Sequence, residues 1–479
     1  MPLQIMSEAN RAEKFPPVTL GEITTAVNGK LVGNERPLVR DVTHDSRQAK
    51  EGSLFVAIRG ELFDAHKFVP QVIEQGAVGI LSELDSPQDW NSLPEVDSGR
   101  GLAPAAWIKV EDVRRAMALA AAEVHHHPSR ELQLVGITGT NGKTTTAYLV
   151  ASIPEAAGEP VAMTGTVEYR IGKDRMKAGR TTPEATDMQR LLRQAVEIGC
   201  RTAVMEASSQ AMDFHRCDEL HFAVAAFTNL TRDHLDYHKT MENYWYAKQR
   251  LFDGRLGSRP KSSVINVDDS YGVELANRLD REGLRVIRYA VNADADVTAT
   301  DPEFSLAGMR FRLRTPAGER DFHSPLVGPP HIYNTLTAVA SGLALGYDLD
   351  VITKGLETCT GAPGRFERVP HDGDFAVVVD YAHSDDALLN VLRTAREVTK
   401  GRIITVFGCG GDRDGSKRAP MGEAAGSLSD VVILTSDNPR TEDPKKILAD
   451  AEVGIKKTGK PYEKIADRRE AIHRAIGQA

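Results

Sequence analysis

The sequence predicts an α/β fold in which mostly parallel sheets are covered by helices. Apolar segments typical of buried strands, at residues 203–205, 223–227 and 263–266, alternate with helical patterns in the middle of the chain. Such alternation is typical of a parallel sheet with helices on both faces. A glycine-rich turn between a strand and a helix, at residues 136–146, supports the same class.

The chain has room for about three domains, because it contains 479 residues. The first is expected to contain strands at residues 53–58, 79–81 and 106–108, before a helix over 113–124 that leads to the glycine-rich turn. A further strand-helix series follows residue 361, with strands expected at 375–379, 402–407 and 431–434. Polar loops after such strands are candidate ligand sites. The predicted domains are residues 1–111, 112–360 and 361–479.

Composition argues against several functional classes. The net charge of −8 disfavours a protein that binds nucleic acid electrostatically. No apolar run approaches the ~20 residues of a membrane span, and the first 15 residues lack the apolar core of a signal peptide. The four scattered cysteines fit reduced thiols. We therefore expect a cytoplasmic protein with neither nucleic-acid nor membrane partners.

The turn Gly-Ile-Thr-Gly-Thr-Asn-Gly-Lys-Thr-Thr-Thr at residues 136–146 predicts an ATP site. Backbone N–H groups of such a turn can surround a phosphate at the start of a helix. Lys143 would reach the β- and γ-phosphates, and the Thr144 hydroxyl would hold Mg²⁺. Ile137 stands where the strict spacing has glycine, so the match is to a shortened variant. The alternative is a polar turn with a solvated lysine, which the flanking strand and helix disfavour.

Three further positions are candidates for the same site. Glu206 ends a buried strand and could hold a cation, or could equally be a satisfied surface glutamate. Residues 229–238 contain two histidines and two aspartates, which suit either a metal site or a capped, solvated loop. Lys248 lies on a predicted helix with an aromatic face. Its amine would ordinarily reach solvent, but if buried beside Mg²⁺ it would be neutral and reactive.

Together these motifs resemble the Mur ligase family, the ATP-dependent amide-bond-forming enzymes of bacterial cell-wall synthesis. The resemblance covers nearly the whole chain and implies a UDP-binding α/β domain, a central P-loop ATPase-type domain and a C-terminal Rossmann-like domain. The matching segments are residues 43–47 (Thr-His-Asp-Ser-Arg), 140–145, 229–236, 246–248 (Tyr-Ala-Lys), His331 with Asn334, 364–367 (Gly-Arg-Phe-Glu) and 380–383 (Asp-Tyr-Ala-His).

The resemblance also implies the chemistry of the central site. A carboxylate would attack the γ-phosphate to form an acyl phosphate, and an amine would then displace phosphate. The implied catalytic residues are Lys143, Lys248, His234 and Glu206, with Lys248 carbamylated to N6-carboxylysine. Mg²⁺ would be held by Thr144, Glu206, His234 and Lys248. ATP would contact Gly139, Thr140, Asn141, Gly142, Lys143, Thr144, Thr145, His331, Asn334, Arg365 and Asp380.

The same resemblance implies two further small-molecule substrates. UDP-N-acetylmuramoyl-L-alanyl-D-glutamate would be held by Ser46, Thr181, Thr182, Ser208 and Arg216. The incoming amino acid would be meso-diaminopimelate, held by Arg413, Asp437, Asn438, Pro439 and Arg440. An arginine can pair bidentately with the distal carboxylate that lysine lacks. Without the family, the Asn-Pro-Arg segment indicates only a turn with a solvated arginine.

Three alternatives stay open: the same reaction with L-lysine, a folylpolyglutamate synthetase-like ligase, and a catalytically silent protein that binds UDP-sugar peptides. Arg440 argues against lysine, and residues 43–47 and 437–440 fit a folate ligase poorly. The chain ends at Ala479, before the Gly-Lys-Gly-His-Glu segment usual in the family, and Ser384-Asp385 and residues 328–330 depart from its pattern. We therefore expect a truncated third domain that binds diaminopimelate weakly, in a monomeric protein.

Overall fold

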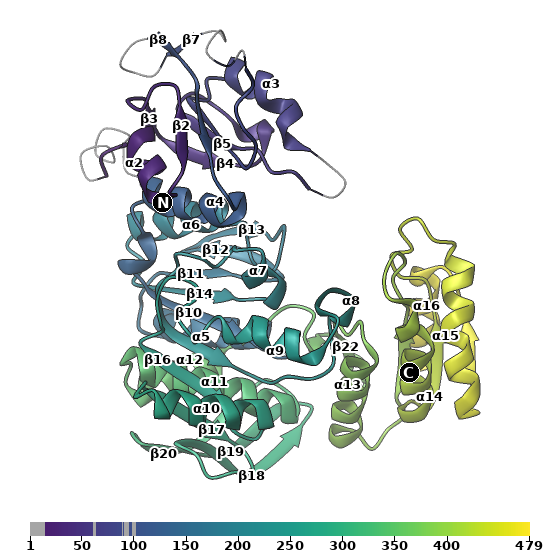
Figure 1. Ribbon diagram of the computed structural model, residues 1–479. Helices are drawn as coiled ribbons and strands as arrows, with labels where there is room; N and C mark the ends of the chain where they lie inside the picture. Colours follow the sequence, from purple (N-terminus) through teal and green to yellow (C-terminus); the bar gives the residue numbers. More distant parts are fainter. Residues whose placement is uncertain (1–14, 61–63, 89, 91–94, 98–101) are drawn as a thin grey trace. The chain divides into compact units, whose positions relative to one another are not determined.

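The computed structural model describes residues 15–60, 64–88, 90, 95–97 and 102–479 (Figure 1). The chain forms two compact units. The first comprises Met1–Ala295 with Thr337–Gly355, and the second comprises Asp296–Leu336 with Leu356–Ala479. Two of the three boundaries between these units fall inside helices, α11 (Pro329–Leu345) and α12 (Leu349–Thr358), and the third lies between Ala295 and Asp296, just before β18. The division into three domains at residues 112 and 361 stays a prediction.

The first unit begins with a five-stranded sheet in the order β2-β9-β6-β5-β4. Its neighbours pair in parallel except β2, which is antiparallel to β9. Side chains alternate between its faces, so Leu54 packs in the core that contains α2 and α4, whereas Phe55 packs in the core that contains α3. The elements are α2 (Leu20–Ala26), β2 (Lys30–Val32), β4 (Asp41–Thr43), β5 (Ser53–Val56), α3 (Val69–Glu74), β6 (Gly79–Ser82), β9 (Ala106–Lys109) and α4 (Val113–Val124).

Shorter elements connect these strands. Two antiparallel pairs are β1 (Val18–Thr19) with β3 (Leu38–Val39), and β7 (Glu95–Asp97) with β8 (Leu102–Pro104). Single 3₁₀ turns are η1 (Ser46–Gln48), η2 (Ala65–Phe68) and η4 (Pro128–Arg130).

A second, larger sheet forms the centre of the first unit, with the strand order β13-β12-β11-β14-β10-β15-β16-β17 (Figure 1). The strands from β11 to β17 in this order are parallel, and β12 and β13 form an antiparallel edge. This arrangement confirms the predicted α/β class. The strands are β10 (Gln133–Thr138), β11 (Val161–Thr164), β12 (Glu168–Ile171), β13 (Asp174–Lys177), β14 (Thr202–Glu206), β15 (Phe222–Phe227), β16 (Ser262–Asn266) and β17 (Val286–Ala290).

Strand β10 is the point at which the chain changes direction across this sheet. The chain leaves β10 through α5 to reach β11 on one side, and it later returns to β15 on the other side. Open α/β sheets bind ligands beyond the carboxyl ends of strands at such a switch point. The surrounding helices are α5 (Lys143–Ala156), α6 (Ala185–Glu197), α7 (Ser209–Asp213), α8 (Leu235–His238), α9 (Met241–Gln249) and α10 (Ser270–Arg281).

The second unit contains an antiparallel ladder, β18-β19-β20, and a three-stranded parallel sheet, β23-β24-β25. Its elements are β18 (Val297–Ser305), β19 (Gly308–Thr315), β20 (Gly318–Ser324), β21 (Glu367–Val369), β22 (Val377–Val379), α13 (Asp385–Val398), β23 (Ile404–Phe407), η5 (Gly415–Lys417), α14 (Arg418–Leu428), β24 (Val431–Leu434), α15 (Pro444–Thr458), β25 (Tyr462–Lys464) and α16 (Arg468–Ile476).

One predicted strand of this unit pairs differently from the expectation. The apolar run at residues 375–379 was expected to join the same strand-helix series as β23 and β24. Its strand β22 instead pairs antiparallel with β21 in a separate two-stranded sheet. Val377 and Val378 are half-buried and Val379 is 46% exposed, which shows that this run is not enclosed in the core of the β23-β24-β25 sheet.

Candidate active site

The loop between β10 and α5 has the geometry of a phosphate-binding loop. Gly139 and Gly142 have φ angles of 149° and 88°, which favour glycine. A Cβ atom on Gly139 would lie 1.9 Å from the Thr228 hydroxyl oxygen, so the loop packs directly on the chain after β15. Helix α5 begins at Lys143, whose Nζ donates to the carbonyl oxygens of Gly139 and Thr140 at 2.9 Å each.

Glu206 lies beside this loop rather than on the surface. Its side chain is buried at the end of β14, and the Thr144 hydroxyl donates to its Oε2 at 3.0 Å. Thr166 donates to the same carboxylate through its backbone N–H at 2.7 Å and its hydroxyl at 3.1 Å. A carboxylate and a hydroxyl at this separation are oxygen ligands of the kind that Mg²⁺ prefers. The residues present therefore fit a Mg²⁺ site.

Lys248 is buried, which excludes the solvent-exposed alternative. The residue is 1% exposed on α9, its Nζ donates to the Gly139 carbonyl oxygen at 2.8 Å, and it lies 4.3 Å from the centre of the Tyr244 ring. Lys143 and Lys248 thus share one acceptor beneath the loop. Burial lowers the pKa of the Lys248 amine well below its usual range, and the Lys143 charge lowers it further, against the opposing charge of Asp233.

His234 precedes α8, and it has a positive φ of 54°. Its Nε2 lies 3.7 Å from the Asp233 carboxylate, and its ring lies 6.0 Å from that of Tyr244. Burial and the charges of Lys143 and Lys248 lower the pKa of His234, against the opposing charge of Asp233. In the part of the chain that the structure describes, no three His, Cys, Asp or Glu side chains gather as a metal site. The predicted set instead combines Glu206 and His234 with Thr144 and a modified Lys248.

The predicted substrate residues of the central domain form a network around Glu206. The Thr182 hydroxyl donates to the Glu206 carbonyl oxygen at 2.8 Å and lies 3.2 Å from the Ser208 hydroxyl, and Ser208 caps α7. The Thr181 hydroxyl lies 3.1 Å from that of Thr166. These side chains place several hydroxyl groups next to the proposed metal ligand.

Arg216 and Ser46 are the other two residues predicted to hold the UDP-linked substrate, and both lie in the first unit. Arg216 pairs with the buried Glu184 at 2.8 Å. Ser46 is buried in η1, which Asp45 caps. The adjacent His44 lies 3.3 Å from the Thr186 hydroxyl, so this segment contacts the start of α6.

Sequence analysis missed Thr166 and Glu184. Thr166 carries no motif, because its role depends on where β11 ends in space. Glu184 directly follows the matched Thr181-Thr182-Pro183, which was the available signal.

The remaining predicted ATP residues lie in the second unit. His331 and Asn334 lie one turn apart on α11, with 3.3 Å between Nδ1 and Nδ2, and burial lowers the pKa of His331 to about 4. Asp380 accepts backbone N–H groups of Phe366 and Ala382 at 2.7 and 2.8 Å. The Arg365 guanidinium lies 5.0 Å from the Tyr381 ring. Their contact with ATP stays a prediction.

The predicted diaminopimelate residues occupy two loops at one edge of the parallel sheet β23-β24-β25. Residues 408–414 follow β23 and residues 435–442 follow β24, and the two loops are joined by hydrogen bonds. Arg440 donates to the Gly411 carbonyl oxygen, Gly411 N–H donates to the Asn438 carbonyl oxygen at 2.9 Å, and the Asp412 carboxylate accepts from Thr441. Arg413 and Asp437 are exposed at the same edge.

A buried arginine, Arg418, stabilises these loops through ion pairs. Arg418 is 4% exposed and pairs with Glu442 at 2.7 Å and with Asp450 at 2.9 Å. Glu442 in turn accepts the Asp412 N–H at 2.5 Å.

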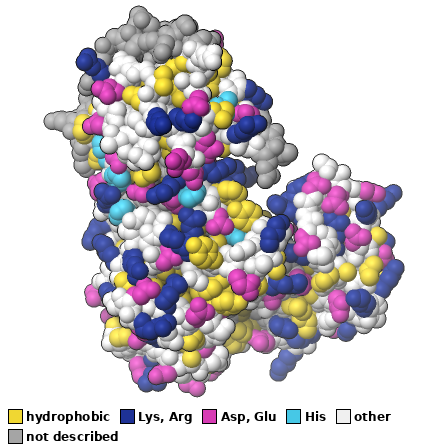
Figure 2. Space-filling view, in the orientation of Figure 1, with side chains coloured by type: hydrophobic (Ala, Val, Ile, Leu, Met, Phe, Trp, Pro, Cys, Tyr) yellow, Lys and Arg dark blue, Asp and Glu magenta, His cyan; other side chains and the backbone are white. Residues whose placement is uncertain are grey.

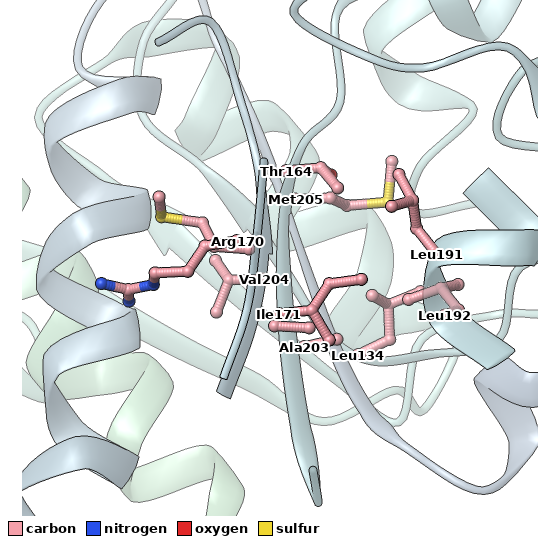
Figure 3. Close-up of a pocket in the computed structure, with 11 residues that line it drawn as sticks. Leu134, Thr164, Arg170, Ile171, Leu191, Leu192, Ala203, Val204 and Met205 are labelled. Carbon is pink, nitrogen blue, oxygen red and sulfur yellow. The ribbon is translucent and has the colours of Figure 1, made fainter. Parts of the chain in front are cut away.

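A small pocket lies away from this chemistry, between the central sheet and α6 (Figure 3). Leu191 and Leu192 of α6 face Ile171 and Ala203 of the sheet, whereas Arg170 points to the other side and pairs with Glu155 at 3.2 Å. The residues that line the pocket are almost wholly apolar, so the pocket is a small gap in the packing between the sheet and α6 rather than a site for a polar ligand.

Figure 2 shows Lys and Arg interspersed with Asp and Glu over the visible face, rather than gathered in one basic surface. Among the described residues, no helix combines the length and apolarity that crossing a membrane requires.

The fold and the loop after β10 define an α/β protein with a phosphate-binding site, and comparison with known families narrows this class. A model described as the Mur ligase middle domain matches residues 137–342. A model described as the Mur ligase, glutamate ligase domain matches residues 364–479. The chain therefore belongs to the Mur ligase family.

Individual relatives cover nearly the whole chain. A Geobacter metallireducens protein named UDP-N-acetylmuramoyl-L-alanyl-D-glutamate–2,6-diaminopimelate ligase is 44% identical over 476 residues, which cover 95% of this chain and 90% of the relative. A Solibacter usitatus protein of the same name is 43% identical over 470 residues, covering 96% and 91%.

Solved structures show the same fold. A structure of a ligase of that name has 32% identity and a TM-score of 0.69, and the match covers 97% of this chain and 91% of that chain. A folylpolyglutamate synthase from Mycobacterium tuberculosis, at 20% identity, shares the fold with a TM-score of 0.60 over 75% of this chain and 86% of that chain.

Proposed function

We propose that this chain is an ATP-dependent ligase that adds meso-diaminopimelate to UDP-N-acetylmuramoyl-L-alanyl-D-glutamate, forming ADP and phosphate in the cytoplasm, where ATP is available. The names of its relatives support the substrates, and the loop after β10 supports the use of ATP. The observation that carries the proposal is the pairing of the buried Lys248 with the half-buried Lys143 at the Gly139 carbonyl oxygen, next to Thr144 and Glu206.

The environment of Lys248 supports its carbamylation. A neutral amine can attack carbon dioxide, forming an N–C bond and releasing one proton, and the product is an anionic carbamate. Such an anion would pair with Lys143 and present oxygen atoms to a cation, whereas the unmodified ammonium would be buried beside another positive charge.

The other residues have complementary roles. Thr144, Glu206, His234 and carbamylated Lys248 would hold Mg²⁺, which when bound would neutralise charge on the phosphates. Lys143 and the loop amides would bind the β- and γ-phosphates. The substrate carboxylate oxygen attacks the γ-phosphorus as ADP leaves. The amine then attacks the acyl carbon, loses a proton and expels inorganic phosphate.

The two loops at the edge of the β23-β24-β25 sheet would select the amino acid. The Arg440 guanidinium lies on the rim of these loops, where it could pair with a carboxylate that lysine lacks. This supports diaminopimelate over L-lysine.

The proposal is tested by measuring phosphate release from ATP with the UDP-linked dipeptide and either amino acid. We expect release that depends on both substrates and is faster with meso-diaminopimelate. A Lys143→Ala variant should release none above background. Equal or faster release with lysine would reject the proposed specificity, and release without the UDP-linked dipeptide would reject the proposed reaction.

A further inference from the structure

Asp269 divides its two carboxylate oxygens between two different elements. Oδ1 accepts the backbone N–H groups of Tyr271 at 2.9 Å and Gly272 at 3.3 Å, and so caps helix α10. Oδ2 accepts the backbone N–H of Leu230 at 2.8 Å, in the loop that follows β15. One side chain therefore fixes the loop after β15 to the start of a helix that packs on β16 and β17.

The residues on either side of Leu230 form hydrogen bonds with the phosphate-binding loop. The Asn229 carbonyl oxygen accepts the Thr140 N–H at 2.8 Å, and its side-chain oxygen accepts the Asn141 N–H at 2.9 Å. On the other side, Thr231 N–H donates to the Thr140 hydroxyl at 3.0 Å. Leu230 lies between these contacts, so displacement of its backbone would move both.

A second bond joins the same two segments. The Asn266 side-chain amide, at the end of β16, donates to the Thr228 carbonyl oxygen at 2.8 Å. Thr228 itself donates to the Asn141 carbonyl oxygen at 2.6 Å. The chain after β16 thus holds the segment 228–231 at two points, of which Asp269 supplies the charged one.

We propose that Asp269 is a positioning residue for nucleotide binding, which acts through Leu230 and Asn229 on the backbone of the phosphate-binding loop. The inference rests on the proposed binding of ATP at that loop. A phosphate-binding loop depends on the directions of its N–H groups, so a support that fixes those directions raises affinity without touching the ligand.

The chemistry of the carboxylate provides a variant that separates this role from helix capping. Asparagine caps helices as well as aspartate does. Its side chain has only one oxygen, however, so Asp269→Asn cannot accept from both α10 and Leu230. Asp269→Ser is a second variant, because a serine hydroxyl can cap α10 but is too short to serve both elements.

The control is the same substitution at another helix cap. Asp467 caps α16 by accepting the Glu470 N–H at 2.8 Å. Asp467→Asn therefore reports on the loss of carboxylate charge at a helix start in the second unit.

The experiment measures the dissociation constant of ADP with Mg²⁺, and separately that of the UDP-linked dipeptide, by calorimetry on the full chain. Asp269→Asn and Asp269→Ser should weaken ADP binding about tenfold, as expected for the loss of one charge-assisted hydrogen bond. Binding of the UDP-linked dipeptide and the behaviour of Asp467→Asn should match the wild type.

Three results would contradict the inference. Unchanged ADP affinity in both Asp269 variants would overturn the inference and leave the proposed function standing. An equal loss of both ligands would show a general structural role and would also overturn it. A wild-type chain that binds no ADP would instead reject the proposed function on which the inference rests.

Discussion

At the scale of single residues, the surroundings of Lys248 do not suit an ammonium ion. Lys248 is buried against the Tyr244 ring and shares the Gly139 carbonyl oxygen with Lys143. The Asp233 charge opposes the effects of burial and of Lys143 only in part, because the pKa of Lys248 is still lowered. A buried charge that is not fully compensated is costly, and either neutralisation or modification relieves that cost. Carbamylation relieves this cost, because it replaces a cation by an anion next to Lys143.

Lys248→Ala should therefore reduce turnover by at least about a hundredfold, because it removes charge stabilisation at the transferred phosphoryl group. A small carboxylate such as acetate, added to the assay, should restore part of the activity by occupying the space left by the side chain. Steady-state rates with and without acetate test this expectation. Full activity in the unsupplemented alanine variant would contradict it.

Arg440→Ala should raise the KM for meso-diaminopimelate by well over tenfold, because losing one partner of a desolvated charge pair costs ~2–5 kcal/mol. The KM for L-lysine should change little. The matched control is Arg474→Ala, which removes an exposed pair between Arg474 of α16 and Glu463 of β25. An equal rise for both amino acids would show that Arg440 does not read the distal carboxylate.

At the scale of elements, the phosphate-binding loop is shaped by its contact with the chain after β15. Gly139→Ala would place a Cβ atom 1.9 Å from the Thr228 hydroxyl and would strain a φ of 149°. We expect ADP affinity to fall by more than tenfold and the free energy of unfolding to fall by about 2 kcal/mol.

Two variants separate the clash from the strain. Gly158 has a φ of 80°, and a Cβ atom added there would have nothing within 4 Å. Gly158→Ala therefore introduces strain without a clash, and it should lower stability without changing ADP affinity. Adding Thr228→Ala to Gly139→Ala should recover part of the lost stability. The absence of any recovery, measured by denaturant unfolding, would show that the clash with Thr228 is unimportant.

At the scale of the first unit, a charged cluster joins β4 to α4 and α6. The Asp41 carboxylate lies 3.1 Å from Arg190, 3.5 Å from His125 and 3.9 Å from Lys50. Burial raises the pKa of Asp41, but His125 and Arg190 outweigh burial and lower it to about 2. The folded state therefore favours the charged form.

This shift predicts a pH dependence of stability. Because the folded pKa lies below the unfolded value of about 3.9, the stabilisation is complete above that value and is lost as pH falls toward about 2. Asp41→Asn should thus lower the free energy of unfolding by about 2 kcal/mol at pH 7 and by much less near pH 2. Asp294→Asn, at an exposed position, is the control. An equal effect of Asp41→Asn at both pH values would contradict the assignment.

Sequence alone predicted the strands β10, β14, β15 and β16 and the loop after β10, because alternating strands and helices and a glycine-rich turn are local signals. It named none of the strands β11, β12, β13 and β17 of the same sheet. The burial of Lys248 and the pairing of Glu206 with Thr144 were left open, since both depend on how distant segments pack. The same limit explains β22, whose apolar run predicted a sheet strand but not its partner β21. Thr166 and Asp269 lie outside any motif and act only through tertiary hydrogen bonds.

Activation of the substrate carboxylate as an acyl phosphate can be tested with an isotope that follows one carboxylate oxygen into the released phosphate. The UDP-linked dipeptide would carry ¹⁸O in its carboxylates, and the released phosphate would be analysed by mass spectrometry after one round of ligation with meso-diaminopimelate. We expect one ¹⁸O atom in each phosphate, because the carboxylate oxygen that attacks the γ-phosphorus leaves with it. Phosphate without ¹⁸O, formed together with the ligated product, would contradict it.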